Sequence, residues 1–330
     1  MLLKTVRSNS PVVLILFLLI SVFIWYPSFC TTDMVLFSFD EVKMPLYELI
    51  FGWLEDKQFL RVFIPFLLIL IQAVFILKIN REFIIIQKQN YLPVLIFILL
   101  TSGFIALQRI NPVVFANLFV VLMLEQLFAS YRKRYALNRL FLAGMFVGIA
   151  TLFYSFSVVY LLIIWISLFL LRTIDLREWF VPVLGVIFPF LFLFATYYIH
   201  GDLTITGLID TMKMNLFNHV TVTHYHISYI LFYSVVFLFI LFGSFSVISR
   251  FPGRKIYVRK FFEILWWMFL APVLMLILMN QVYAEILYFI AVPTTFLISD
   301  YVNSIKNRTM GNLMFLLLFA SLVYIWIVQV

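Results

Sequence analysis

Long runs of apolar residues, separated by short polar segments, dominate this chain. Runs such as residues 12–25 and 141–152 are apolar on every side, without the alternation of a half-buried strand. A helix needs about 20 apolar residues to cross a bilayer, and that length predicts about eleven spans. The expected spans are Pro11–Phe29, Leu60–Leu77, Leu92–Leu107, Pro112–Ala129, Leu140–Tyr154, Phe156–Leu171, Trp179–Ile199, Ile227–Ser249, Phe262–Met279, Val282–Ser299 and Met310–Val328.

The fifth and sixth of these segments are short and almost touch, so residues 140–171 predict either a hairpin of two spans or one long bent helix. The basic residues favour two spans, because cytoplasmic loops are enriched in Lys and Arg. With eleven spans, Met1 is cytoplasmic, Val330 lies on the outer side, and all but five of the 23 basic residues face the cytoplasm. The five expected on the outer side are Lys43, Lys57, Arg61, Arg109 and Lys213.

The composition predicts one all-α integral membrane domain over residues 1–330. The chain is 65% hydrophobic and only 12% charged, which a soluble domain of this length could not bury. The net charge of +8 does not indicate a nucleic-acid partner, because the basic residues lie at span ends. Lys4 and Arg7 precede the first apolar run without a cleavage pattern, which predicts an uncleaved anchor in a bacterial inner membrane.

Two long loops are expected on the outer side, at residues 30–59 and 200–226. Apolar residues recur at helical spacing in Pro45–Leu54 of the first loop and in Ile205–Val220 of the second. Both segments therefore predict short helices that lie along the outer face of the membrane, with Trp53 facing lipid or the bundle.

The first loop also carries a concentration of acids. Its adjacent carboxylates Asp40 and Glu41 are the candidate catalytic residues, because a carboxyl group beside a low-dielectric surface can have a raised pKa and act as a base. The alternative is that these acids only solvate the loop.

Arg109 is the main candidate for binding a lipid phosphate. It lies in a tight outer turn, and a guanidinium at headgroup depth can hold a phosphate through two hydrogen bonds. Arg61 and Lys213 are further candidates for the same role. The alternative is that these side chains simply extend to the membrane surface from the ends of helices.

Several other polar residues are candidates for function. Asn117 and Glu285 are expected within or just below the membrane surface, where polar groups are costly. The second loop contains the histidines His200, His219, His224 and His226. Two imidazoles spaced as His-x-His can bind zinc, but no carboxylate or cysteine with suitable spacing accompanies them, so the sequence predicts no metal site and no cofactor.

Three segments between residues 90 and 189 resemble an uncharacterised multipass inner-membrane protein family of Bacteroidota. They are Asn117-Leu118-Phe119, Gly148-Ile149-Ala150-Thr151-Leu152-Phe153-Tyr154 and Arg177-Glu178-Trp179-Phe180-Val181-Pro182-Val183-Leu184-Gly185. This family has no established activity, so the resemblance implies a membrane location and fold but no reaction.

A broader resemblance is to the GT-C class of glycosyltransferases, in which one span precedes an outer acidic loop and many further spans. Those enzymes take sugars from polyprenyl-phosphate carriers. Phe39-Asp40-Glu41-Val42 looks like the Asp-Glu motif in the first loop of protein O-mannosyltransferases. The resemblance implies that Asp40 or Glu41 assists the acceptor, although the loop here is shorter than is usual for the class.

Two functions therefore compete ahead of a third, a transporter, for which the sequence shows neither paired half-helices nor pseudo-symmetric halves. The favoured one is a non-catalytic membrane component that binds lipid, or other envelope proteins, in an envelope pathway. The alternative is a GT-C-like glycosyltransferase that uses a polyprenyl-phosphate-linked sugar, with Arg109 holding the carrier phosphate. An outer pocket that joins Arg109 to Asp40 or Glu41 would favour the enzyme, whereas dispersed positions would favour the binding component.

Overall fold

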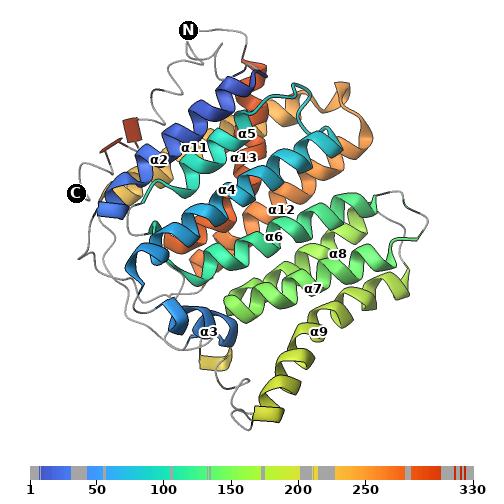
Figure 1. The fold of residues 1–330 in the computed structure, drawn as a ribbon. Coiled ribbons are helices and arrows are strands. Elements are labelled where there is room, and N and C mark those ends of the chain that lie inside the picture. Colours follow the sequence, from blue (N-terminus) through green and yellow to red (C-terminus); the bar gives the residue numbers. More distant parts are fainter. Residues whose placement is uncertain are drawn as a thin grey trace.

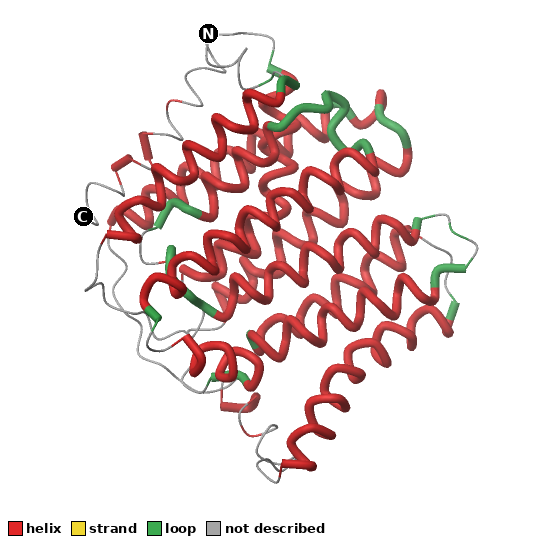
Figure 2. The backbone as a smooth tube through the Cα atoms, viewed as in Figure 1, coloured by secondary structure: helices red, strands yellow, loops and turns green. Residues whose placement is uncertain are grey.

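The structure is a computed structural model. It describes residues 7, 9–30, 43–54, 57–104, 107–131, 133, 135–171, 175–200, 210, 212–214, 227–278, 284–305, 316, 320–321 and 323–324. Helices pack side by side in this part of the chain, and they are joined mostly by short loops (Figures 1 and 2). No strand occurs among the described residues, so the prediction of a helical bundle is confirmed.

The helices largely follow the apolar runs of the sequence. In chain order they are α2 (Pro11–Cys30), α3 (Pro45–Leu54), α4 (Gln58–Phe83), α5 (Leu92–Thr101), α6 (Pro112–Ser130), α7 (Leu137–Phe153), η2 (Ser155–Val159), α8 (Tyr160–Leu171), α9 (Leu176–His200), α11 (Ile227–Ser249), η3 (Phe251–Gly253), α12 (Ile256–Leu278), η4 (Ala284–Ile286) and α13 (Leu287–Ser304). Of the described helices α2, α4, α6, α9 and α12 are long and apolar enough to cross a membrane. The count of about eleven spans stays a prediction.

Burial separates an interior from a lipid-facing surface. Every residue of α5 is buried, and α6 and α13 are buried along most of their length. In contrast, α2, α9 and α11 expose large apolar side chains, among them Phe23, Phe192 and Phe245. Such rows of exposed hydrocarbon are unfavourable in water and suit a bilayer, which agrees with a membrane protein.

The segment at 140–171 is a hairpin, as one of the two alternatives predicted. Tyr154 has an extended backbone and separates α7 from η2 and α8. At the start of α7, Arg139 donates a hydrogen bond to Gln126 of α6 at 2.7 Å. At the end of α8, the Leu170 carbonyl accepts one from Lys260 of α12 at 2.5 Å. Gln126 and Lys260 lie at the same end of the bundle, because the nearby Phe128 and Phe261 stack with their ring centres 4.1 Å apart. The two helices therefore run in opposite directions.

Helices α7 and α9 cross in direct backbone contact. A Cβ atom added to Gly144 would lie 2.1 Å from the Pro182 carbonyl oxygen, and one added to Gly185 would lie 2.3 Å from that of Phe141. Small residues four apart, as at Gly144 and Gly148, allow this close approach between membrane helices. Beyond the crossing, the C-terminal part of α9 diverges from α7 (Figure 1).

The bounds of several predicted spans differ from the structure. Helix α4 continues to Phe83, past the predicted end at Leu77, and α12 begins at Ile256, before the predicted start at Phe262. The predicted span Leu92–Leu107 is too long, because α5 ends at Thr101. The chain then turns to hydrogen bond with α2, and the Trp25 indole donates to the Ser102 hydroxyl at 2.9 Å. The predicted span Met310–Val328 lies almost wholly outside the described residues.

Candidate functional site

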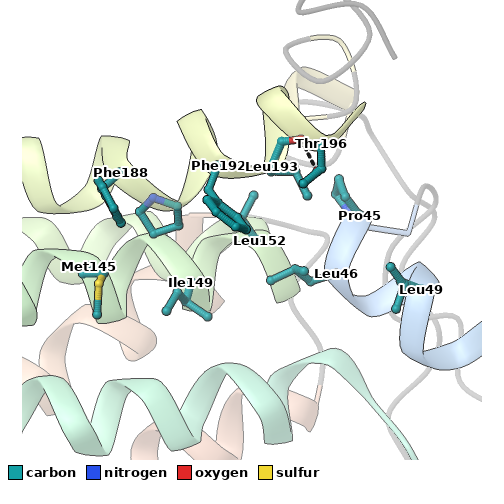
Figure 3. A pocket seen from close by; sticks show the side chains of 11 residues that line it. Pro45, Leu46, Leu49, Met145, Ile149, Leu152, Phe188, Phe192, Leu193 and Thr196 are labelled. Carbon is teal, nitrogen blue, oxygen red and sulfur yellow. Dashed lines mark hydrogen bonds between the residues drawn. The ribbon is translucent and has the colours of Figure 1, made fainter. Parts of the chain in front are cut away.

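An open cavity of about 690 Å³ lies between α3, α7 and α9. Figure 3 shows the side chains that line it, which come from all three helices. They belong to Pro45, Leu46, Leu49, Met145, Ile149, Leu152, Phe188, Pro189, Phe192, Leu193 and Thr196. Among these residues Thr196 alone has a polar side chain, and its hydroxyl donates to the Leu193 carbonyl at 2.7 Å. The cavity therefore suits hydrocarbon and not a polar ligand.

The cavity exists because α7 and α9 separate after their close crossing. Near the crossing, Pro189 Cγ lies only 3.1 Å from the position that a Cβ atom of Gly148 would take. Farther along, the helices diverge (Figure 1), and the cavity lies between side chains of both helices. Helix α3 lies beside the C-terminal end of α7 and lines the cavity with Pro45, Leu46 and Leu49.

Helix α3 has the bounds that the sequence predicted, Pro45–Leu54, and it uses two faces. Tyr47 and Leu54 are buried against the bundle, and the Tyr47 hydroxyl donates to the Ile110 carbonyl at 3.4 Å. The other face carries Leu49, which lines the cavity. The apolar spacing of α3 therefore reflects both its contact with the bundle and its part in the cavity lining.

Three cations rest on aromatic rings around α3. The Lys43 ammonium lies 3.6 Å from the centre of the Phe51 ring, and the Arg61 guanidinium lies 5.6 Å from the same ring. The Lys57 ammonium lies 3.7 Å from the Trp53 ring. Such contacts attract a cation to the face of a ring. Among the described residues none of the three forms an ion pair with a carboxylate.

Lys57 lies close to the cavity side of α3. Trp53 follows Leu49 by four residues, so the two side chains share one face of the helix, about 5–6 Å apart along its axis. The Lys57 ammonium covers the Trp53 ring, and Trp53 is 62% exposed. A positive charge therefore stands about one helical turn beyond the apolar lining, at the surface of the bundle.

The loop before α6 packs against α3 and carries Arg109. The Ile110 carbonyl accepts the hydrogen bond from Tyr47 of α3. The Leu107 carbonyl accepts one from the Tyr288 hydroxyl of α13 at 2.8 Å. These bonds fix the backbone on both sides of Arg109, whose side chain is half-buried. Arg109 and Arg61 therefore lie at the same end of the bundle as α3.

Some of the other predicted site residues are described by the structure, and others lie outside the described residues. Asp40 and Glu41 lie outside the described residues, so their catalytic role stays a prediction, and the same holds for most of the predicted helix Ile205–Val220. Lys213 is exposed in the helical stretch 212–214. Among the described residues, no three His, Cys, Asp or Glu side chains are grouped so that they could hold a metal ion. His219, His224 and His226 lie outside the described residues.

Asn117 and Glu285 are buried away from the cavity lining. The Asn117 amide donates to the Gln72 carbonyl oxygen at 2.8 Å, and the Gln72 amide donates to the Val114 carbonyl at 2.8 Å. These bonds join α4 to α6, while Asn117 Oδ1 is buried without a hydrogen-bond partner among the described residues. Glu285 is 1% exposed in η4, just before α13.

Sequence reasoning missed the cavity and a second charged cluster at the opposite end of the bundle. There Asp300 of α13 accepts hydrogen bonds from Arg250 and Arg254, each at 2.6 Å. The available signal was a carboxylate near the end of an apolar run, together with a group of basic residues elsewhere in the chain. For the cavity, the available signal was Gly144, Gly148 and the apolar stripe of α3.

Comparison with known proteins adds no relative. No protein-family model matches this chain, and no match is found among curated proteins or among solved structures. The resemblance to an uncharacterised Bacteroidota family and that to GT-C enzymes therefore stay predictions.

Proposed function

We propose that this protein is a multipass membrane protein that binds a phosphate-bearing lipid at α3. The hydrocarbon chain lies in the cavity between α3, α7 and α9, and the phosphate lies beside the cations around α3. The apolar lining of that cavity is the observation that carries the proposal. Its volume falls in the range of about 300–1,000 Å³ that is usual for small-molecule sites.

The headgroup contacts are needed for selectivity. A lipid chain is already surrounded by hydrocarbon in the bilayer, so it gains little hydrophobic free energy by entering an apolar cavity. Shape and charge must therefore distinguish one lipid from another. Basic residues near a membrane surface contribute about 1 kcal/mol each toward anionic lipids. Lys57 supplies such a charge on the cavity side of α3, and Lys43 and Arg61 add two more over Phe51.

This proposal corresponds to the lipid-binding component that the sequence favoured. A GT-C-like glycosyltransferase would require the same lipid-phosphate site and, in addition, an acid that acts on the acceptor. The binding site is therefore tested first. Sugar transfer that is lost in Asp40→Asn or Glu41→Gln, with lipid binding unchanged, would extend the proposal to an enzyme.

The direct test fills the cavity. Ile149 lines the cavity on α7, so Ile149→Trp is expected to exclude the lipid chain. Ile187 is 43% exposed on α9 and is not part of that lining, so Ile187→Trp is the matched control. Native mass spectrometry of protein extracted from membranes should show a retained anionic lipid on the wild type and on Ile187→Trp. The Ile149→Trp variant should retain at least tenfold less.

Equal retention by Ile149→Trp and the wild type would refute the proposal. Size-exclusion profiles and thermal unfolding of both variants check that the bundle is intact. If Ile149→Trp does not fold, the smaller change Ile149→Phe is used, with Ile187→Phe as its control.

A further inference from the structure

A second cavity, of about 300 Å³, lies at the end of the bundle away from α3. It is formed by the end of α4, the end of α6 and the start of α12. Aromatic rings dominate its lining, and one carboxylate and one ammonium group accompany them. The lining includes the carboxylate of Glu82 and the rings of Phe83, Phe128, Tyr131, Tyr257 and Phe261.

The rings form one connected cluster. Phe128 and Phe261 are stacked with their centres 4.1 Å apart, and Phe83 meets both edge to face at 5.8 and 5.9 Å. Tyr131 and Tyr257 lie 5.8 and 5.7 Å from Phe261. Five rings thus line one small cavity, and because Phe128 and Phe261 are each 1% exposed, the ring surface open to a ligand belongs mainly to the half-buried Phe83, Tyr131 and Tyr257. Groups of aromatic rings are the usual binding sites for organic ammonium ions, which the negative ring faces attract.

The charged residues complement a zwitterion. Glu82 lines the cavity and is exposed, and among the described residues it has no ion pair. The neighbouring Lys78 is bound to Glu125 instead, at 2.7 Å. Lys133 also lines the cavity. A carboxylate and an ammonium group on one aromatic cavity match a ligand that carries a cation and an anion close together.

The backbone beside the cavity is held in an uncommon conformation. Ile84, which also lines the cavity, has φ 49° and ψ 49°. This left-handed conformation is rare for a β-branched residue and costs on the order of 1–3 kcal/mol. The turn is held by Asn80, whose side chain accepts a hydrogen bond from the Ile86 N–H at 3.0 Å. The reversal at Ile84 ends α4 directly after Glu82 and Phe83.

We propose that this cavity binds the headgroup of a zwitterionic phospholipid, with its ammonium group against the aromatic rings and Glu82, and its phosphate toward Lys133. A lipid is the expected source of the ammonium group because the cavity lies where the membrane helices α4, α6 and α12 reach the end of the bundle. This inference is independent of the site at α3.

The test compares short-chain lipids that differ in their headgroups. Full-length protein in detergent is titrated with dihexanoylphosphatidylcholine, with the corresponding phosphatidylglycerol and with choline chloride, and binding is followed by saturation-transfer NMR. The proposal predicts transfer from aromatic protons to the N-methyl groups of the phosphatidylcholine. It also predicts at least tenfold weaker binding of phosphatidylglycerol and of choline.

Variants then locate the site. Glu82→Gln and Tyr257→Leu should each weaken phosphatidylcholine binding about tenfold. Tyr257→Phe, which keeps the ring, should bind normally, as should the exposed Asp175→Asn at the same end of the bundle.

Equal binding of the two lipids, or unchanged binding in Glu82→Gln, would overturn the proposal. If choline binds as tightly as the phosphatidylcholine, the cavity recognises a free organic ammonium ion, and the proposal of a lipid headgroup is refuted. The Ile149→Trp variant should leave these results unchanged, which separates this test from that of the α3 site.

Discussion

Two clusters of charged side chains, at opposite ends of the helix bundle, hold their charges in opposite ways. Around α3, Lys43 and Lys57 lie over aromatic rings at the surface. At the other end, Asp300 is 3% exposed and binds both Arg250 and Arg254. The first arrangement leaves positive charge available to a ligand, whereas the second satisfies charge within the fold. We propose that the cluster around α3 binds an anionic lipid, whereas the ion pairs of Asp300 hold α13 to the segment between α11 and α12.

The physical costs of the two arrangements differ accordingly. Taking a charge out of water is expensive unless it is paired. Burial lowers the pKa of the Arg250 guanidinium, and Asp300 opposes that shift by stabilising the charged form. The cations at α3 avoid this cost because they stay partly in water, and a lysine on a ring face keeps donors for an anion.

The largest expected effect comes from removing the buried carboxylate. Asp300→Asn leaves the buried Arg254 without its counter-charge, so we expect a loss of about 3–5 kcal/mol of stability. Thermal unfolding in detergent measures this loss. Because Arg254 is the source of the cost, the double variant Asp300→Asn with Arg254→Met should recover part of the stability. An unchanged melting temperature in Asp300→Asn would show that the cluster is not structural.

The crossing of α7 and α9 should be nearly as sensitive. Gly185→Ala places a methyl group 2.3 Å from the Phe141 carbonyl oxygen, so we expect about 1–3 kcal/mol of destabilisation and loss of lipid retention. Gly52→Ala on α3 is the control, because nothing lies within 4 Å of the added methyl group. A neutral Gly185→Ala would contradict the origin given for the cavity.

A smaller effect is expected from the cations at α3. Replacing Lys43 and Lys57 together by Gln should lower affinity for an anionic lipid by about 2 kcal/mol, which is about 30-fold. The loss should shrink as salt is raised. Arg81 and Lys255, which lie 5.0 Å from the Tyr91 ring and 5.9 Å from the Tyr257 ring at the other end, provide the matched double control Arg81→Gln with Lys255→Gln. Equal losses in the two variants, measured with phosphatidylglycerol vesicles, would remove the distinction between the two ends.

The sequence predicted local features of this molecule better than distant contacts. The bounds of α3 follow from Pro45 and the apolar spacing after it, both of which are local. The end of α5 was predicted six residues too late, at Leu107 instead of Thr101. The hydropathy pattern carries no information about the hydrogen bond between Trp25 and Ser102, which are 77 residues apart in sequence. Tertiary hydrogen bonds override such local patterns.

The candidate site was predictable only in part. Arg61 and Arg109 were chosen for their charge and expected depth, and both lie at the α3 end. The cavity beside them depends on where α7 and α9 cross, and that crossing is set by Gly144 and Gly185, which lie far apart in sequence. The residue pattern within one helix does not determine the angle at which that helix crosses another.

The central claim is that a lipid chain occupies the cavity between α3, α7 and α9. The most direct measurement uses phosphatidylglycerol with a photoreactive diazirine in one acyl chain, reconstituted with the full-length protein, followed by mass spectrometry of the crosslinked peptides. The account predicts crosslinks concentrated on Leu49, Ile149 and Phe192, and their loss in Ile149→Trp. Crosslinks spread evenly over the exposed faces of α2, α9 and α11, with the same pattern in Ile149→Trp, would contradict it.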